Sequence, residues 1–404
     1  MRNRSSELDS FRDLSRSVAW TVAQAPKSGT TGNSWMLENR AILALGSAAF
    51  AVSEYEDIRS RFEIDTIPLN SVTGHSSVAK AVAEAVETRA AAGKSPYIAF
   101  IWFFGTAPFS PFDENMLKPL TRNGCRFFSG GGAGYDDVAT EWMASEGAYY
   151  CNTPTAITVS TANGALMLIL SATRAITQGD IYTRTGKWRG NASVLGDLFP
   201  LGDDIEGLTL GIIGLGSIGK ALAVRAQACG MNVIYNSRRR LLDSEANGAT
   251  YVPMDELLAT SDVISVNCPL TPTTRHLLGP AEFAKMKTGV FIVNTARGAI
   301  IDEDALAQAL KSGKGQSRSF CLFTELLTLR FAVFRVGLDV FEREPIIHEG
   351  LLDPSLAYRV TLQPHTTGRT NQAFTKGERQ IIKSLQEFMR GERPEYAVND
   401  PKPY

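Results

Sequence analysis

One stretch limits what this chain can fold into more than any other. Residues 207–220 read Gly-Leu-Thr-Leu-Gly-Ile-Ile-Gly-Leu-Gly-Ser-Ile-Gly-Lys, so a short apolar run ends in the spacing Gly-x-Gly-x-x-Gly. An alanine-rich run with helical spacing follows, and residues 229–235 form a second apolar run at the distance expected of the next strand. Strand, glycine turn and helix in this order are typical of a parallel sheet that binds a dinucleotide.

Each glycine of this turn has a predicted role. The three permit the tight turn, the close approach of the backbone to a pyrophosphate, and the close packing of helix on strand. The N–H groups at the start of the helix face the diphosphate, where the helix dipole is positive. A glycine-rich turn that binds nothing is the competing interpretation. The residues predicted to contact the cofactor here are Gly214, Gly216, Ser217, Ile218 and Gly219.

Length and composition narrow the class of protein. A chain of 404 residues can form two domains with substantial cores, and 44% hydrophobic with 21% charged residues is ordinary for a globular protein. The net charge of −1 gives no electrostatic case for nucleic acid or a membrane as partner. The five cysteines are scattered without a Cys-x-x-Cys pair, which predicts no metal site and a reducing, cytoplasmic location.

The first residues differ in character from the rest. Residues 1–38 are rich in Ser, Arg, Gly and Thr, and we expect a disordered extension. Their spread arginines also suggest a mitochondrial presequence, but Glu7, Asp9 and Asp13 argue against it because such peptides are poor in acids. Translation starting at Met36, just before the first apolar run at 41–45, is a second hypothesis for this segment.

The remaining chain divides into two regions of alternating strands and helices. Residues 39–157 lack a phosphate-binding turn of their own, which predicts a substrate domain completed by residues 369–404. A long apolar helix is expected over 158–178, either as a core helix or as an interdomain helix that also buries surface against a second subunit. Residues 158–368 form the predicted dinucleotide-binding domain. The predicted fold class is α/β, with two Rossmann-like domains on parallel sheets, the substrate domain being flavodoxin-like.

Polar clusters follow the expected strands of the second region. Each expected strand is a short apolar run that ends in polar residues able to do chemistry. No apolar run of the chain reaches the ~18–20 residues that a membrane span needs. Open parallel sheets bind ligands at the carboxyl ends of their strands, so these clusters mark the expected site. They are 268–274, 295–298, 341–345 and 363–368.

Four blocks give the chain a specific resemblance. They are Gly-Ala-Gly-Tyr-Asp at 132–136, the glycine turn, Asn-Thr-Ala-Arg-Gly-Ala-Ile-Ile-Asp at 294–302, and Gly-Leu-Asp-Val-Phe-Glu-Arg-Glu-Pro at 337–345 followed by Pro-His-Thr-Thr-Gly at 364–368. Over about residues 125–390 the chain resembles the D-isomer-specific 2-hydroxyacid dehydrogenases, which include glyoxylate and hydroxypyruvate reductases. The resemblance implies an NAD(P)-dependent oxidoreductase and a homodimer built around the 158–178 helix.

Members of this family reduce 2-oxo acids, and three residues here have the chemistry that this reduction needs. Arg297 can hold a substrate carboxylate with its two-pronged guanidinium. His365 is the natural acid for the carbonyl oxygen, since imidazole titrates near neutrality. A carboxylate should keep that imidazole protonated and oriented; Glu344 occupies the family's position, and Glu342 is the alternative because both precede Pro345.

The resemblance also implies further contacts. Ala133 and Gly134 would offer backbone N–H groups to the substrate carboxylate, beside Arg297 and His365. Asp339 is expected either to contact the nicotinamide or to support the residues that contact the substrate. The alternative is that it simply caps the end of its strand. The other residues expected to contact the cofactor are Pro269, Thr274, Thr295 and Ala296.

The form of the cofactor depends on the end of the second strand. In NAD-type members an acidic residue there takes the ribose hydroxyls, whereas this chain has Ser237 followed by Arg238, Arg239 and Arg240. No acid repels a 2′-phosphate and arginines are available to bind it, so Ser237 and Arg238 predict NADP as the preferred cofactor and NAD as the second. A solvated basic turn is the alternative.

One segment departs from the family pattern. Residues 315–335 intervene where a short connection is usual, and Phe320–Phe334 is too apolar for an ordinary surface loop. The segment is either a genuine insert that covers a subunit face or a retained intron translated in frame. We expect it at the amino end of a strand, opposite the cofactor, where it would affect solubility more than chemistry.

Together these features predict reduction of a small 2-oxo acid, of the glyoxylate or hydroxypyruvate type, to a D-2-hydroxy acid. Two alternatives stay open at this point. A nucleotide-sensing binding protein of the corepressor type would keep similar Arg, Glu and His residues, although no long tail follows residue 390. An inactive product of a mis-spliced gene would follow from the 315–335 segment.

Overall fold

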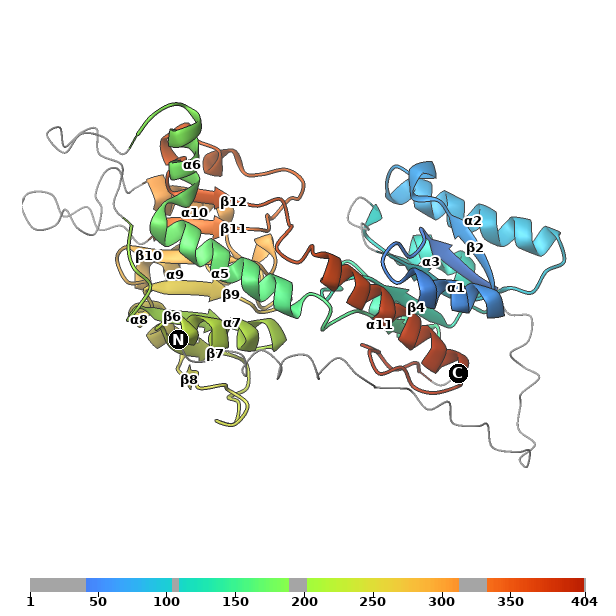
Figure 1. Cartoon of the computed structure of the whole chain (residues 1–404). Helices are drawn as coiled ribbons and strands as arrows, with labels where there is room; N and C mark the ends of the chain where they lie inside the picture. Colours follow the sequence, from blue (N-terminus) through green and yellow to red (C-terminus); the bar gives the residue numbers. More distant parts are fainter. Residues whose placement is uncertain (1–40, 104–108, 189–201, 312–332, 403–404) are drawn as a thin grey trace, which may run out of the picture. The chain divides into compact units, whose positions relative to one another are not determined.

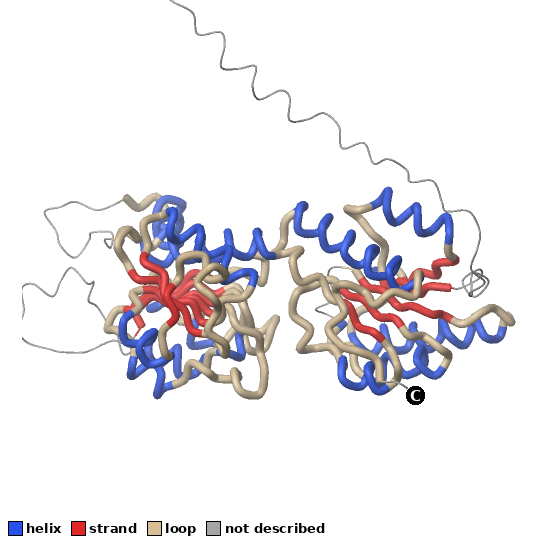
Figure 2. The backbone as a smooth tube through the Cα atoms, turned by 90° about the horizontal axis from the view of Figure 1, so that it is seen from below, coloured by secondary structure: helices blue, strands red, loops and turns tan. Residues whose placement is uncertain are grey.

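The computed structural model describes residues 41–103, 109–188, 202–311 and 333–402 (Figure 1). Within this part of the chain the strands form two parallel sheets, each with helices on both faces (Figure 2), which confirms the predicted α/β fold class. The predicted N-terminal extension, Met36 and residues 315–332 of the atypical segment lie outside the described residues.

The first sheet has five strands in the order β2-β1-β3-β4-β5, which is the flavodoxin-like order. Its strands are β1 (Ala41–Leu45), β2 (Glu63–Ile67), β3 (Tyr97–Trp102), β4 (Phe127–Gly130) and β5 (Tyr149–Cys151). Its helices are α1 (Val52–Arg61), α2 (His75–Ala91), α3 (Glu114–Arg122), α4 (Thr140–Ser145) and α11 (Asn371–Met389), with a 3₁₀ turn, η3 (Leu69–Ser71).

Strand β1 shows why this sheet is buried on both faces. Its side chains alternate between the two faces, so Leu43 and Leu45 join a core cluster with α2 and α3, whereas Ile42 and Ala44 join a second cluster with α1 and α11. Every residue of β1 is buried, as expected of a central strand in a parallel sheet. The first sheet therefore uses a helix from the far end of the chain to cover one face.

The second sheet has seven strands in the order β12-β11-β10-β9-β6-β7-β8, with the order reversing at β6 as in dinucleotide-binding folds. Its strands are β6 (Thr209–Ile213), β7 (Asn232–Asn236), β8 (Thr250–Tyr251), β9 (Val263–Val266), β10 (Val290–Asn294), β11 (Val333–Leu338) and β12 (Val360–Leu362). Its helices are α5 (Thr158–Arg174), α6 (Ile176–Arg184), α7 (Ser217–Ala228), α8 (Met254–Thr260), α9 (Pro280–Lys285) and α10 (Glu303–Lys311), with 3₁₀ turns η6 (Gly298–Ile300), η8 (Glu349–Leu351) and η9 (Pro354–Leu356).

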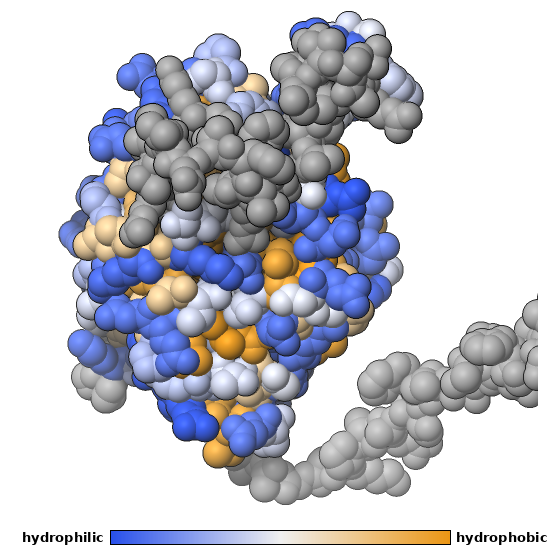
Figure 3. Space-filling view, turned by 90° about the vertical axis from the view of Figure 1, so that its left-hand side faces the viewer, coloured by the Kyte–Doolittle hydropathy of each residue, from blue (hydrophilic) through white to orange (hydrophobic). Residues whose placement is uncertain are grey.

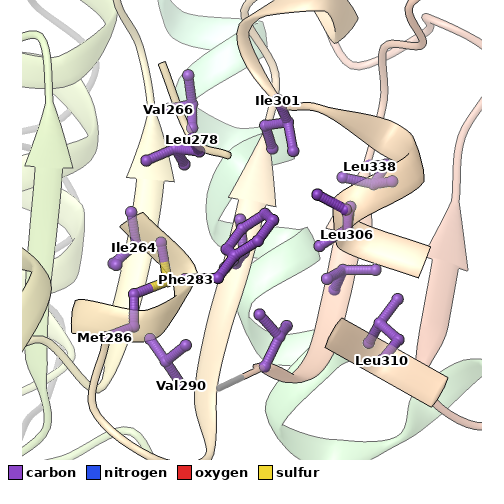
Figure 4. Packing of buried hydrophobic residues seen from close by; sticks show 14 of the residues in the cluster. Ile264, Val266, Leu278, Phe283, Met286, Val290, Ile301, Leu306, Leu310 and Leu338 are labelled. Atoms are coloured by element: carbon purple, nitrogen blue, oxygen red, sulfur yellow. The ribbon is translucent and has the colours of Figure 1, made fainter. Parts of the chain in front are cut away.

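Two apolar layers hold the second sheet. On one face, β9 and β10 pack against α9 and α10 through side chains such as Ile264, Phe283 and Leu306 (Figure 4). On the other face, α5 and α7 supply Leu168, Ile169 and other small or branched residues. These layers fix the strands, so the loops at their carboxyl ends are held at defined positions.

Two sequence predictions about element boundaries are wrong. The apolar helix expected over 158–178 ends at Arg174, because Ala175 adopts a left-handed backbone (φ 51°) and α6 starts after a bend of 68°. In addition, β11 begins at Val333, so the last three residues of the 315–335 segment belong to the sheet. Apolar composition alone did not reveal either boundary.

A test for membrane-spanning helices gives one weak result. In the described residues no single helix is long and apolar enough to cross a membrane; the bent pair α5 and α6 passes by length and composition only. Helix α5 is largely buried between its neighbours, and buried core helices pass the same test.

Arg335, on β11, is a buried cation with incomplete pairing. Its side chain is 1% exposed, and Nη1 donates only long bonds of 3.3 Å to the carbonyls of Ala172 and Thr173. Within the described part of the chain, Nε and Nη2 have no hydrogen-bond partner. Burial lowers the pKa of this guanidinium, the attraction of Asp203 opposing the effect. Unpartnered buried donors each cost about 1–3 kcal/mol.

We therefore expect Arg335→Met to stabilise the protein by about 1–3 kcal/mol, because methionine fills much of the space without polar atoms. Urea unfolding measures the change. Arg359→Met is the matched control: Arg359 is equally buried, but it donates to the Leu310 carbonyl at 2.8 Å and to the Tyr358 hydroxyl at 3.2 Å. That variant should lose stability, and a loss in both would contradict the explanation.

Candidate active site

The glycine turn after β6 has the geometry that a dinucleotide requires. Gly214 has φ +99°, and a Cβ atom there would lie 2.7 Å from the backbone nitrogen of Cys268. A Cβ atom at Gly219 would overlap the Gly214 carbonyl oxygen, so α7 packs on the turn only because a glycine stands there. At Gly216, by contrast, a Cβ atom would meet nothing within 4 Å. The open space lies where a diphosphate would approach the backbone.

The start of α7 has no side-chain cap. Gly216 is its N-cap residue and supplies no side-chain hydrogen bond. The first N–H groups of a helix need acceptors from outside the helix, and an anion at this position satisfies them. Ser217 and Ile218 stand in this first turn. The residues present thus fit a dinucleotide at the predicted place.

Ser237 lies directly after β7, one residue beyond the strand end at Asn236. Its hydroxyl accepts a hydrogen bond from the Leu215 N–H at 2.9 Å, which joins it to the glycine turn. Arg238, Arg239 and Arg240 are exposed. Among the described residues Arg239 faces Glu245 at 3.9 Å, whereas Arg238 has no ion pair there.

Further predicted cofactor residues lie on the loops after β9 and β10. The Thr274 hydroxyl donates to the Pro269 carbonyl at 2.7 Å and accepts from the Thr271 N–H, which fixes this loop. The Ala296 N–H donates to the Asn294 side chain at 3.0 Å. The buried Thr295 hydroxyl has no hydrogen-bond partner among the residues that the structure describes. Such a buried polar atom at the carboxyl end of a strand fits a site that a ligand completes.

Glu344 and His365 form a close pair. Glu344 Oε2 lies 2.8 Å from His365 Nδ1, while Oε1 accepts from the Phe341 N–H at 3.0 Å. Burial raises the pKa of Glu344, but the hydrogen bond with His365, the charges of His365 and Arg297 and the backbone bond together bring it below its usual 4.5. The alternative partner, Glu342, instead binds Arg275 at 2.6 Å and His276 at 3.0 Å.

Asp339 fixes the backbone that carries His365. His365 has a left-handed backbone (φ 54°), which is uncommon for a residue other than glycine. Its N–H donates to the Asp339 carbonyl at 2.8 Å, and the Asp339 carboxylate accepts from the N–H groups of Thr366 and Thr367 and from the Thr367 hydroxyl. Asp339 is 1% exposed, and burial raises its pKa against these hydrogen bonds. In the structure this side chain contacts the histidine segment.

Arg297 lies against the predicted substrate turn. Its Nε donates to Asp136 at 2.8 Å, and its Nη1 to the Ala296 carbonyl at 2.9 Å. A Cβ atom at Gly134 would overlap Nη2 of Arg297, so only glycine permits this approach. The Ala133–Gly134 turn and Arg297 are therefore brought together.

The supporting residues of this turn were not predicted from the sequence. Asn152 donates to the Ala133 carbonyl at 2.7 Å, and the Thr153 hydroxyl accepts from the Gly132 N–H at 2.8 Å. Both follow β5 directly, so their place after a strand was the signal that could have found them. Asp136 lies in the Gly-Ala-Gly-Tyr-Asp block at 132–136, but its pairing with Arg297 depends on the fold.

The described residues contain no group of three His, Cys, Asp or Glu side chains placed to hold a metal ion. The groups that the structure brings together are a guanidinium, a carboxylate–imidazole pair and backbone donors of the Ala133–Gly134 turn. This set can bind a carboxylate and deliver a proton to an oxygen beside it.

Known proteins with similar sequences belong to one enzyme family. Residues 166–319 match the model of the D-isomer specific 2-hydroxyacid dehydrogenase, NAD binding domain. The chain is 39% identical to the putative 2-hydroxyacid dehydrogenase C1773.17c of Schizosaccharomyces pombe, over 89% of this chain and 96% of that protein. It is 38% identical to 4-methyl-2-oxopentanoate reductase A of Aspergillus oryzae, over 68% of this chain and 75% of that protein.

One solved structure has a similar fold over most of the chain. The glyoxylate reductase from Paecilomyes thermophila superimposes with a TM-score of 0.75 at 33% identity, covering 89% of this chain and 98% of that chain. The likeness extends over both sheets and not only over the glycine turn.

Proposed function

Because the chain belongs to the D-isomer specific 2-hydroxyacid dehydrogenase family and is an NAD-dependent oxidoreductase, we propose that it reduces a small 2-oxo acid to the D-2-hydroxy acid. Substrates of the glyoxylate or hydroxypyruvate type are proposed, in line with the glyoxylate reductase named above. The observation that carries the proposal is the 2.8 Å contact between Glu344 and His365 at the carboxyl end of the sheet that holds the glycine turn.

The residues have complementary roles in this proposal. Arg297 binds the substrate carboxylate through guanidinium N–H groups that Asp136 and the Ala296 carbonyl do not use, helped by N–H groups of the Ala133–Gly134 turn. His365 donates a proton to the carbonyl oxygen through the ring nitrogen that does not face Glu344. Glu344 orients the imidazole and places a carboxylate beside it, and Asp339 holds the backbone of the His365 segment. The chemistry that a reduced nicotinamide would supply when bound is the hydride for the carbonyl carbon.

The test is oxidation of NADPH and of NADH with glyoxylate and with hydroxypyruvate, followed by absorbance. Turnover supports the proposal, and chiral analysis of the glycerate formed from hydroxypyruvate should show the D isomer, since the glycolate formed from glyoxylate has no stereocentre. A folded protein that binds the nucleotide but reduces no 2-oxo acid would contradict it and favour a nucleotide-sensing binding protein. If the protein aggregates, the assay is repeated with residues 315–332 replaced by a short loop.

We propose NADP as the preferred cofactor. The support is that Ser237 offers no negative charge at the end of β7 and that exposed Arg238 follows it. Hydrogen bonds to charged groups contribute about 1.5–3 kcal/mol each, so an arginine on a 2′-phosphate changes affinity by about 10–100-fold.

Arg238→Ala is accordingly expected to raise the KM for NADPH about 10–100-fold and to leave the KM for NADH nearly unchanged. Steady-state kinetics with both cofactors measure the change. Arg122→Ala, an exposed arginine on α3, is the control and should change neither value. Equal changes for both cofactors in the Arg238 variant would refute a contact with the 2′-phosphate.

A homodimer is proposed around α5 and its neighbours. The face drawn in Figure 3 shows apolar residues in patches among hydrophilic ones. Helices α5, α6 and α7 carry five exposed apolar side chains. They are Val159 and Met167 on α5, Ile176 and Ile181 on α6, and Val224 on α7. Burying such side chains against a second copy would remove them from water.

We expect Met167→Glu to halve the mass measured by light scattering after size exclusion, because a carboxylate in an apolar interface is poorly tolerated. Leu352→Glu is the control, since Leu352 is also exposed and apolar but lies after η8. A wild-type chain that is monomeric at micromolar concentration would disprove the proposed dimer.

A cytoplasmic location is also proposed. Cys125, Cys151, Cys229 and Cys268 are free thiols in the structure, which fits a reducing compartment. Fractionation of native cells with a tagged chain tests it, and recovery in mitochondria would favour the presequence interpretation.

A further inference from the structure

Glu378, on α11, is a buried carboxylate used in an unusual way. It is 2% exposed, and among the described residues it has no cationic partner. Its oxygens instead accept three backbone N–H groups, from Ala49 at 2.9 Å, Phe50 at 2.8 Å and Ala51 at 2.6 Å. A buried charge is costly unless it is well hydrogen-bonded, so this arrangement holds the turn strongly.

The bonded turn joins β1 to α1. Ala51 is the N-cap residue of α1 and supplies no side-chain cap, so Glu378 provides from another helix the negative charge that the start of α1 favours. The turn also contacts α11 through side chains, since the rings of Phe50 and Phe374 are 5.0 Å apart. Phe50 stays 39% exposed despite this contact.

The turn lies at the edge of the first sheet where the substrate is expected. It follows the carboxyl end of β1, which pairs with β3, and β3 pairs with β4. The Ala133–Gly134 turn follows β4. Neighbouring strands are about 4.8 Å apart, so the two turns leave the sheet about 10 Å from each other. A side chain of phenylalanine size can reach across much of that distance.

Helix α11 also connects this turn to the histidine segment. It begins at Asn371, six residues after His365, with Thr370 as its cap. Helix α11 thus carries Glu378, and its first residue follows shortly after His365, the proposed proton donor.

We propose that Glu378 is a positioning residue, which fixes the 49–51 turn so that Phe50 forms one wall of the site for the 2-oxo acid. The inference rests on the proposed function. Loss of the fixed turn should weaken binding of the 2-oxo acid, while the chemical groups at Arg297 and His365 stay in place.

The experiment compares Glu378→Gln with Glu387→Gln. Glu387 is a matched control because it lies on α11, is 8% exposed and accepts a backbone N–H, that of Glu395, at 2.8 Å. Wild-type turnover is measured first, so failure of the proposed function is recognised separately. In Glu378→Gln we expect the KM for the 2-oxo acid to rise about 10-fold or more, with the KM for the nicotinamide cofactor unchanged.

Glu387→Gln should keep the wild-type KM even where its melting temperature falls. A wild-type KM in folded Glu378→Gln, or an equal rise in both variants, overturns the proposal. If Glu378→Gln does not fold, Phe50→Ala decides: it leaves all three N–H bonds in place and should raise the same KM at least 3-fold. An unchanged KM in that variant also overturns the proposal.

Discussion

His365→Asn should lower kcat for reduction of a 2-oxo acid by about 10²–10⁴-fold, the usual contribution of a positioned proton donor. Asparagine is chosen because it tolerates the left-handed backbone that His365 adopts, so the loss reports on chemistry rather than on folding. Cofactor affinity, measured by fluorescence titration, should change little.

The chain offers a close control for this variant. His276 also has a left-handed backbone (φ 52°) and also contacts a glutamate, Glu342, at 3.0 Å. His276→Asn should therefore keep nearly the wild-type kcat. Comparable losses in both variants would show that His365 is not the proton donor.

The pH–rate profile of Glu344→Gln tests the role of His365 as the proton donor paired with Glu344. Since the pKa of Glu344 is held below 4.5, its charge is constant across the range of an ordinary assay, and pH dependence near neutrality comes from other groups. Removing this charge disfavours the imidazolium, so the pH above which reduction declines should move to a lower value. A pH–rate profile that keeps its alkaline limb would argue against the pairing.

Arg297→Lys is the second variant with a large expected effect. Lysine keeps the charge but cannot bind Asp136 and a carboxylate with a planar fork, so at least one charged hydrogen bond is lost. At about 1.5–3 kcal/mol for one such bond, kcat/KM for the 2-oxo acid should fall at least about 10–100-fold, mainly through KM. The KM for the cofactor should stay near its wild-type value.

Arg275→Lys serves as the control for Arg297→Lys. Arg275 donates to Glu342 at 2.6 Å and thus forms a comparable guanidinium–carboxylate pair on a neighbouring loop. Its replacement should leave kcat/KM within about 3-fold of wild type, since exposed pairs contribute little. If Arg297→Lys behaves in the same way, a role in holding the substrate carboxylate is untenable.

Much of the fold could be predicted because its signals are local. The glycine turn predicts a turn between strand and helix, and the apolar runs of β6, β10 and β1 predict buried strands. The alternation of these strands with helices indicates parallel sheets. The end of α5 at Arg174 was missed because the left-handed Ala175 carries no sequence mark. The start of β11 was missed because Arg335 does not look like a buried strand residue.

The sequence predicted which residues belong to the site better than it predicted their contacts. Arg297, Glu344 and His365 follow strand ends within recognisable blocks, so their neighbourhood could be expected. The sequence did not decide between Glu342 and Glu344, because that choice depends on which way each side chain leaves the loop. Asp136, Asn152 and Glu378 act through contacts between distant segments, which no local pattern encodes.

The position of α11 in the chain has a consequence for biosynthesis. The face of the first sheet that carries Ile42 and Ala44 is covered by Ile381 and Leu385, which leave the ribosome long after β5. At roughly 5–20 residues per second, the interval between the last strand and its covering helix is on the order of 10–40 seconds. During that time an apolar sheet face is open to water, so newly made chains should depend on chaperones that bind exposed hydrophobic surface before α11 emerges.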